Sequence, residues 1–169
     1  MRLLPGDHDF FLRILPAVYA RRTSGAFFDE TLRLIGDLVH FDYGGWSTYV
    51  LADPPRLAQV VESELRMTPH LVTMFEQAIY SHPFPGYWIN SRDVTALMLS
   101  DFSSVAYTSV AGIMNAYHAL DVKHDLSLPV YFGKTQSVAL SLFRKARAFS
   151  ERDRFIMNLL QLLERWKTR

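Results

Sequence analysis

The sequence predicts an α+β fold in which one antiparallel sheet of about five strands carries helices on both of its faces. Two segments, 43–62 and 125–143, each contain a pair of short runs in which apolar and polar residues alternate on either side of a turn. Such alternation is typical of half-buried strands, and two runs around a short turn predict an antiparallel hairpin. Apolar residues at helical spacing between and after the hairpins predict the helices that cover the sheet.

The composition is that of a folded domain and excludes several classes of protein. A chain of 169 residues with 49% apolar and 21% charged residues is large enough for one sizeable core and too apolar for disorder. The absence of cysteine excludes disulfides, iron–sulfur clusters and thiol catalysis. A formal net charge of +1 gives no sign of a nucleic-acid-binding surface. Because we find no signal peptide and no apolar run long enough to cross a bilayer, we expect a cytoplasmic protein without membrane contact.

The first half of the chain predicts two helices followed by a hairpin. Helices are expected over 7–19 and 27–40, because their apolar residues recur at helical spacing. Residues 43–51 alternate and are rich in aromatic and β-branched side chains, which favour a strand. After a turn at 53–55, the second strand of the hairpin is expected over 57–62.

The second half predicts two further helices on either side of an irregular segment. A helix is expected over 69–80, where a proline occupies the first helical position. Residues 82–88 contain two prolines and a glycine, which we take to exclude both a helix and a central strand. A short strand is expected at 95–99, and a helix over 105–120 leads into the second hairpin.

The last predicted element is a helix over 151–167 that begins at a capping box formed by Ser150 and Asp153. Its apolar stripe is wider than one face of a helix needs to cover a sheet. Ile156, Leu160 and Leu163 are expected to face the sheet. The residues expected at a dimer interface are Phe155, Leu159, Leu162 and Trp166. The alternative is that this second side packs against the helix predicted over 7–19.

Several short motifs occur in the order found in one family of sensory domains. They are His82-Pro83, Ser100-Asp101-Phe102, Leu120-Asp121-Val122 and the stretch Phe149-Ser150-Glu151-Arg152-Asp153-Arg154 that opens the last helix. Over roughly 24–166, the chain thereby resembles the GAF-like sensory domain of LuxR-type bacterial transcription regulators.

This resemblance implies an organisation and a function. It implies an N-terminal helical extension at 1–23, a GAF-like sensory domain at 24–150 and a signalling and dimerisation helix at 151–169. It also implies a homodimer that binds an unidentified small molecule. Contact with DNA would occur only through a helix-turn-helix domain, which the sequence does not contain. The related acyl-homoserine-lactone domains are disfavoured, because their spaced Trp, Tyr and Asp pattern is not found, and the sequence identifies no cofactor.

The segment from 82 to 102 is the candidate wall of a ligand pocket. Irregular, aromatic-rich segments beside a sheet often close over a ligand, and the resemblance places His82 at the pocket. The candidate ligand-binding residues are His82, Phe84, Tyr87, Trp88, Trp46, Phe102 and Tyr117. The alternative is that these rings simply seal the core, which would make the protein a structural dimerisation module with a self-filled pocket and no ligand.

No motif predicts catalysis or a metal site. Gly133-Lys134-Thr135 lacks the earlier glycine of a phosphate loop, and Gly44-Gly45-Trp46-Ser47 is not a nucleophile elbow. The six histidines contain no pair at the spacings typical of zinc sites. We therefore expect a protein that is not an enzyme and holds no metal.

Overall fold

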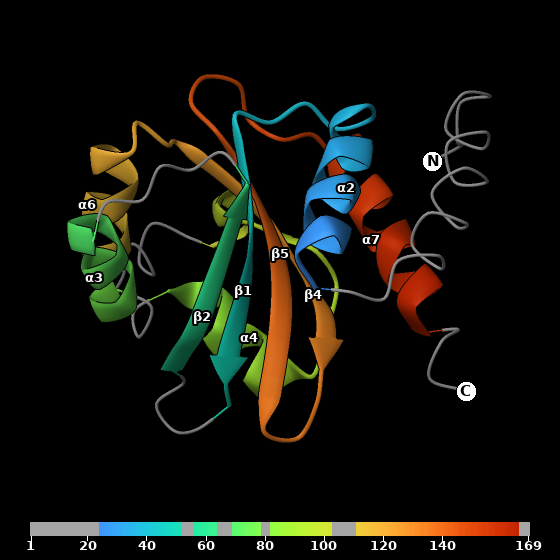
Figure 1. Ribbon diagram of the computed structural model, residues 1–169, viewed down its shortest axis with the longest axis horizontal. Helices are drawn as coiled ribbons and strands as arrows, with labels where there is room; N and C mark the ends of the chain where they lie inside the picture. The colour runs from blue at the N-terminus through green and yellow to red at the C-terminus, as the bar shows by residue number, and fades with distance from the viewer. Residues whose placement is uncertain (1–23, 52–55, 64–68, 79–81, 103–110, 166–169) are drawn as a thin grey trace.

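The structure is a computed structural model that describes residues 24–51, 56–63, 69–78, 82–102 and 111–165. The helix predicted nearest the N-terminus lies outside these residues and stays a prediction. The described residues form one antiparallel sheet with helices on both faces (Figure 1). The predicted α+β class is confirmed.

The sheet has the strand order β2-β1-β5-β4-β3, and all neighbouring strands are antiparallel. Its strands are β1 (Tyr43–Val50), β2 (Arg56–Ser63), β3 (Leu97–Met98), β4 (His124–Phe132) and β5 (Gln136–Arg144). Four of them are long, whereas β3 pairs with β4 through two residues only. Both predicted hairpins are present, as β1–β2 and β4–β5, and they join through β1 and β5. The last strand in the sequence is therefore the central strand of the sheet.

The two faces of the sheet carry different helices (Figure 1). The helices are α2 (Ser24–Gly36), α3 (Pro69–Ala78), α4 (Pro83–Ser91), α6 (Ala111–Ala119) and α7 (Glu151–Arg165). Helices α2 and α7 pack on one side, which we call the α2/α7 face. Helices α4 and α6 pack on the other, the α4/α6 face, and α3 lies beside α6. The short 3-10 turn η2 (Leu99–Asp101) follows β3.

Each face has its own apolar core, because neighbouring residues of a strand point to opposite sides. The core of the α2/α7 face includes Leu32, Ile35, Trp46, Leu126, Leu128, Leu140, Leu142, Ile156, Met157 and Leu160. The core of the α4/α6 face includes Tyr49, Phe84, Trp88, Leu97, Ile113, Tyr117, Ala139 and Phe143. Helix α7 therefore shares a core with the sheet, as predicted for Ile156 and Leu160.

The predicted capping box at the start of α7 is present. The Asp153 N–H donates to the Ser150 hydroxyl at 3.2 Å, and the Ser150 N–H donates to the Asp153 carboxylate at 2.8 Å. These reciprocal bonds satisfy backbone groups that have no partner within the helix. A guanidinium nitrogen of Arg144, at the end of β5, lies 3.2 Å from the same carboxylate. The start of α7 is therefore bonded to the end of the central strand.

The prediction that residues 82–88 exclude a helix was wrong, because α4 covers most of them. His82 is the N-cap, and both prolines, Pro83 and Pro85, fall in the first turn. The N–H groups of a first turn have no partner within the helix, so prolines there cost no hydrogen bond. The helix ends at Arg92, which adopts the left-handed conformation at φ 56°.

Candidate functional site

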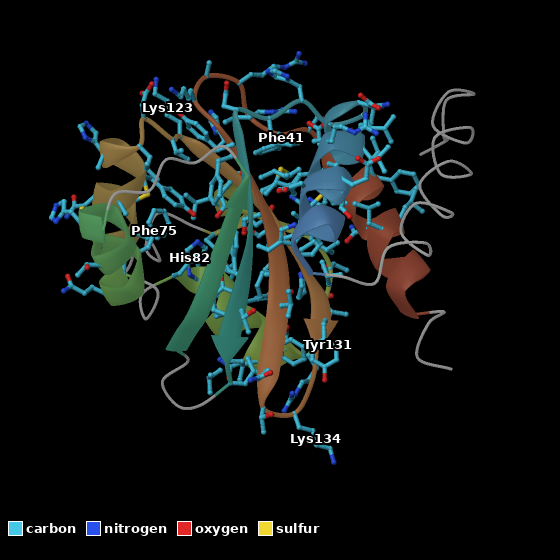
Figure 2. The ribbon with its side chains drawn as sticks, viewed as in Figure 1. Phe41, Phe75, His82, Lys123, Tyr131 and Lys134 are labelled. Carbon is cyan, nitrogen blue, oxygen red and sulfur yellow. The ribbon has the colours of Figure 1, made fainter. Side chains whose placement is uncertain are left out.

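A cluster of buried polar side chains lies on the α4/α6 face. Its members are His82, Tyr117, Asp125, Ser127 and Ser141, all of them buried. They come from the cap of α4, from α6, and from the strands β4 and β5. We call them the polar cluster. In Figure 2, His82 lies between the sheet and the helices α3 and α6, on the side where Phe75 of α3 is also found.

The strand pattern explains why these side chains meet. Leu126 and Leu128 of β4 belong to the α2/α7 core, so the residues that alternate with them, Asp125 and Ser127, face α4 and α6. Ser127 is directly opposite Ser141 across the β4–β5 ladder. Their hydroxyl oxygens are 2.7 Å apart.

Asp125 is the centre of the cluster. Its Oδ1 accepts a hydrogen bond from Ser127 at 2.7 Å, and its Oδ2 accepts one from the Tyr117 hydroxyl. The side chain of His82 approaches the same Oδ2, with Nε2 at 3.4 Å. A carboxylate so deeply buried requires donors of this kind, because burial removes the water that would otherwise solvate it.

The tautomer of His82 follows from its role as a helix cap. Its Nδ1 accepts the N–H of Phe84 at 3.2 Å, so Nδ1 carries no proton and the neutral ring carries its proton on Nε2. This Nε2 lies 3.0 Å from the Tyr117 hydroxyl oxygen. One side chain therefore starts α4 and donates into the polar cluster.

Tyr117 and Tyr49, both in the core of this face, are held in their neutral forms. Burial raises the pKa of Tyr117 well above its usual value, and the adjacent Asp125 carboxylate raises it further. Burial is also the main cause of a raised pKa at Tyr49; a hydrogen bond with Ser47 opposes this shift and the charge of Asp125 adds to it. Both phenols keep their protons at neutral pH.

The rings of Phe84, Trp88 and Phe102 lie beside the polar cluster, and we call them the aromatic wall. The ring of Phe84 lies 4.5 Å from that of His82, 5.8 Å from that of Trp88 and 5.5 Å from that of Phe102, measured between centroids. Tyr117 lies 5.8 Å from Phe143 of β5. The rings of α4 and α6 therefore pack against the sheet in the region where Asp125 is buried.

The part of the sheet beneath this wall is made of small residues. Gly45, Ser47, Ser127, Ala139 and Ser141 occupy neighbouring positions on β1, β5 and β4. The α2/α7 face of the same strands instead carries Trp46 and a series of leucines. Protein interiors are close-packed, so a floor of small side chains has to be matched by large groups from above or by a guest molecule. Of the two faces, the α4/α6 face is the one that combines small strand residues with large rings from the helices.

The structure brings together five of the seven candidate ligand-binding residues. His82, Phe84, Trp88, Phe102 and Tyr117 belong to the polar cluster and the aromatic wall.

Of the other two candidates, one lies at the edge of this group and one on the opposite face. Tyr87 is 37% exposed; its ring packs against Phe102 at the outer end of the wall, and its hydroxyl donates to Asp93 at 3.2 Å. Trp46 faces α2 and α7 on the opposite side of the sheet.

Sequence reasoning missed Asp125, Ser127 and Ser141. The alternation over 125–143 predicts only a half-buried strand, and the polar residues of such a strand, here Asp125 and Ser127, usually face solvent. The signal that could have found them was the prediction of helices on both faces of the sheet. With helices on both sides, the polar side of an inner strand has to be buried, and a buried aspartate requires partners.

The residues predicted at a dimer interface are described only in part. Phe155 and Leu159 are half-buried, next to the fully buried Ile156 and Met157. The side chain of Leu162 and the whole of Trp166 lie outside the described residues. Within the described part of the chain, no three metal-ligating side chains come together and no helix is long and apolar enough to span a membrane.

Comparison with known proteins supports the fold and adds no close relative. No protein-family model matches the sequence, and no curated protein matches it. Among solved structures, the ligand-binding domain of VqsR from Pseudomonas aeruginosa matches with a TM-score of 0.66 at 15% identity, covering 96% of this chain and 98% of that one. The N-acylhomoserine-lactone-dependent LuxR-family transcription factor CepR2 from Burkholderia cenocepacia matches at 0.62 and 12% identity, over 95% and 92%.

A GAF domain is also similar. That of a sensor histidine kinase from Pseudomonas syringae matches with a TM-score of 0.52 at 11% identity, covering 94% of this chain and 83% of that one. The chain therefore has a GAF-like fold, shared with the ligand-binding domains of LuxR-type regulators. The resemblance found in the sequence is confirmed at the level of the fold.

Proposed function

We propose that this protein is the small-molecule-binding sensory domain of a bacterial transcription regulator. The observation that carries the proposal is the buried polar cluster, which lies under an aromatic wall on the side of the sheet made of small residues. The similar fold of LuxR-family ligand-binding domains supports the same function. In this proposal His82, Tyr117 and Asp125 contact the polar part of the ligand. Phe84, Trp88 and Phe102 contact its apolar part, and Tyr87 lies at the rim.

One peptide group links this site to α7. The indole N–H of Trp88 donates to the Thr95 carbonyl at 3.3 Å. The N–H of the same peptide group, that of Ala96, donates to the Asn158 side chain of α7 at 2.7 Å. A displacement of Trp88 would therefore move the Ala96 N–H that donates to Asn158 of α7.

A second link joins α7 to the segment that follows α4 and contains this peptide group. Asp101 of η2 accepts a hydrogen bond from the Met98 N–H at 2.8 Å, and its other oxygen lies 2.5 Å from the Arg154 guanidinium. The loop between the site and α7 is thus bonded to the helix at two points, through Asn158 and Arg154. In our proposal the ligand binds one arrangement of this loop and helix more tightly than another, because a ligand with equal affinity for both would shift neither.

The proposal includes a homodimer formed through the outer side of α7. Phe155 and Leu159, together with Leu162 and Trp166, would meet the same helix of a second copy. Such a contact would carry the occupied state to a DNA-binding helix-turn-helix domain outside this sequence, in the bacterial cytoplasm where such regulators act. Apolar surface on a terminal helix is a common location for such an interface.

A second candidate function rests on a specific observation. Phe84, Trp88 and Tyr117 are each 1% exposed and contact neighbouring rings. These side chains could fill the space above the small residues by themselves. The protein would then be a structural dimerisation module without a ligand.

Native mass spectrometry of the purified protein separates the two functions. A dimer that carries a co-purified small molecule supports the sensory domain and identifies the ligand. A ligand-free dimer whose melting temperature does not change across a metabolite panel supports the structural module. A ligand-free monomer without such a change contradicts both.

A matched pair of variants locates the site. Trp88→Phe changes the α4/α6 face, and Trp46→Phe makes the same change on the opposite face. Loss of the adduct in Trp88→Phe alone is the expected result. Equal loss in both variants would contradict the proposed location.

A further inference from the structure

The hydrogen bonds of the polar cluster all point the same way. Ser127 gives its single hydroxyl proton to Asp125, so in its 2.7 Å contact with Ser141 the donor is Ser141. Tyr117 also gives its proton to Asp125. His82, whose Nδ1 accepts a backbone N–H, directs its remaining N–H at Tyr117 and Asp125. Each side-chain proton of the cluster is thus directed towards the carboxylate.

The cluster can therefore accept further hydrogen bonds but cannot donate them. Its side-chain protons are used within the cluster, whereas lone pairs remain on the Ser141 hydroxyl, on the Tyr117 oxygen and on the carboxylate. A guest that donates a hydrogen bond can join without breaking any of these contacts. A guest that only accepts has to displace an internal hydrogen bond first.

The charge of the cluster favours the same kind of guest. Asp125 is 2% exposed, and the contacts it receives from the described residues come from two hydroxyls and a neutral imidazole. Neutral donors compensate a buried charge only in part. The field of this carboxylate also contributes to the raised pKa of Tyr117 and of Tyr49. A positive or donor-bearing group beside it is stabilised, and a second negative charge is repelled.

We propose that the ligand has an uncharged or positively charged head group that donates hydrogen bonds, such as an amide, hydroxyl or amine, joined to an apolar body. The head group binds beside Ser141, Tyr117 and Asp125, and the apolar body lies against Phe84 and Trp88. Molecules whose only polar group is an anion are rejected by Asp125. This inference rests on the proposed function, and it names the chemical class that the same site selects.

The test uses four probes with the same apolar body: hexanamide, hexan-1-ol, hexylamine and hexanoate. Binding is measured by saturation-transfer NMR and titration on the full chain at neutral pH. We expect hexanamide to bind more tightly than hexanoate by about tenfold or more. The reason is that a second negative charge beside a buried carboxylate is strongly unfavourable. Asp125→Asn is expected to abolish this discrimination. Ser141→Ala, which leaves the donors to Asp125 in place, is expected to weaken the amide alone.

Each outcome decides a different question. If hexanoate binds as tightly as the amide, the ligand class is overturned while the sensory function stands. If no probe binds, the co-purified molecule seen by native mass spectrometry decides the class: a donor-bearing head group supports it and an anionic one overturns it. If there is neither probe binding nor an adduct, both the class and the proposed function fail. If Asp125→Asn does not fold, as judged by circular dichroism, Ser141→Ala carries the test.

Discussion

Asp125 is the residue on which the packing of the α4/α6 face depends. It is the charged centre of a face whose core is otherwise mostly aromatic and aliphatic, and it accepts hydrogen bonds from Tyr117 of α6 and from Ser127 of its own strand β4. The cost of burying this charge is offset only while these donors stay in place. Removal of a single polar atom from the cluster should therefore lower the free energy of unfolding measurably.

Replacement of Tyr117 by Phe tests this dependence. The change removes a hydroxyl that donates to Asp125 and accepts from His82 while it keeps the ring. We expect the free energy of unfolding to fall by about 1–3 kcal/mol, the usual effect of leaving a buried polar group short of a partner. Urea denaturation followed by circular dichroism measures it. Tyr87→Phe, which loses a hydroxyl at an exposed position, is the control, and an equal loss in both variants would contradict the prediction.

Alkaline pH should destabilise the fold through Tyr49 and Tyr117. Their pKa values are raised in the folded state, whereas both ionise near pH 10 when unfolded. The stability that they contribute is therefore fully present below about pH 10 and is lost as the pH rises further. Each tyrosine should lower the free energy of unfolding by about 1.4 kcal/mol per pH unit in that range.

Urea denaturation between pH 8 and pH 11 measures this slope, which Tyr117→Phe should reduce by the share of one tyrosine. Absorbance at 295 nm gives an independent check. If all eight tyrosines ionised near pH 10 in the folded protein, the prediction would be refuted.

At the scale of elements, Arg144 joins three parts of the fold. From the end of β5, it donates to the His40 carbonyl after α2 at 2.6 Å, to the Ala148 carbonyl at 3.0 Å and to Asp153 of α7 at 3.2 Å. Its guanidinium also lies 4.1 Å from the centre of the Phe149 ring. An arginine can make these contacts together because its planar group has several fixed donors.

Replacement of Arg144 by Met should cost about 3 kcal/mol or more of unfolding free energy, because it removes one partner of a buried ion pair and leaves carbonyls without donors. Thermal and urea denaturation measure the loss. Lys145→Met is the control, since that side chain is 40% exposed and its nearest carboxylate, Asp121, lies at 3.9 Å. A loss below 1 kcal/mol for Arg144→Met, by the ordinary scale of exposed pairs, would show that the junction contributes little.

The elements show which features the sequence could predict. The hairpins and α7 were predictable because each has a strong local signal: alternation in β4 and β5, and the capping box at Ser150. Helix α4 was missed because the effect of a proline depends on its position relative to the helix start, and that start is set by the side chain of His82. The face towards which Trp46 points was not predictable either, since alternation separates two faces without saying which helices cover them.

At the scale of the whole molecule, α7 contacts elements that are far apart in the sequence. It packs against β4, it is bonded to the loop after α4, and its Arg152 donates to the Leu38 carbonyl at 3.2 Å. The signalling part of the proposed function depends on the loop contact. Coupling between the site and the helix should therefore be detectable without any ligand.

A double-mutant cycle between Trp88→Phe and Asn158→Leu measures that coupling. Both residues bond to the peptide group between Thr95 and Ala96, so their effects on the free energy of unfolding should be non-additive, by about 0.5–1.5 kcal/mol. A cycle between Tyr87→Phe and Asn158→Leu is the control, because Tyr87 has no bond to that peptide. Additivity of both cycles to within about 0.5 kcal/mol would show that the peptide group transmits nothing.

The short length of β3 has a consequence for the behaviour of the protein at high concentration. Beyond Ser127, β4 has no further strand partner on its outer side among the described residues, and such an edge can recruit strands from other molecules. The backbone carbonyl of Phe143 accepts a hydrogen bond on the β1 side of β5, and that of Arg144 accepts one on the β4 side. Because these directions alternate along a strand, the backbone groups of Ala139 also point towards β1. In its β4 partner, Pro129, the nitrogen therefore points away from β5, to the open edge. Proline has no N–H to donate at this edge, and the β4–β5 pairing is irregular between Pro129 and Tyr131. The open edge is thereby a poor template for intermolecular sheet growth and aggregation.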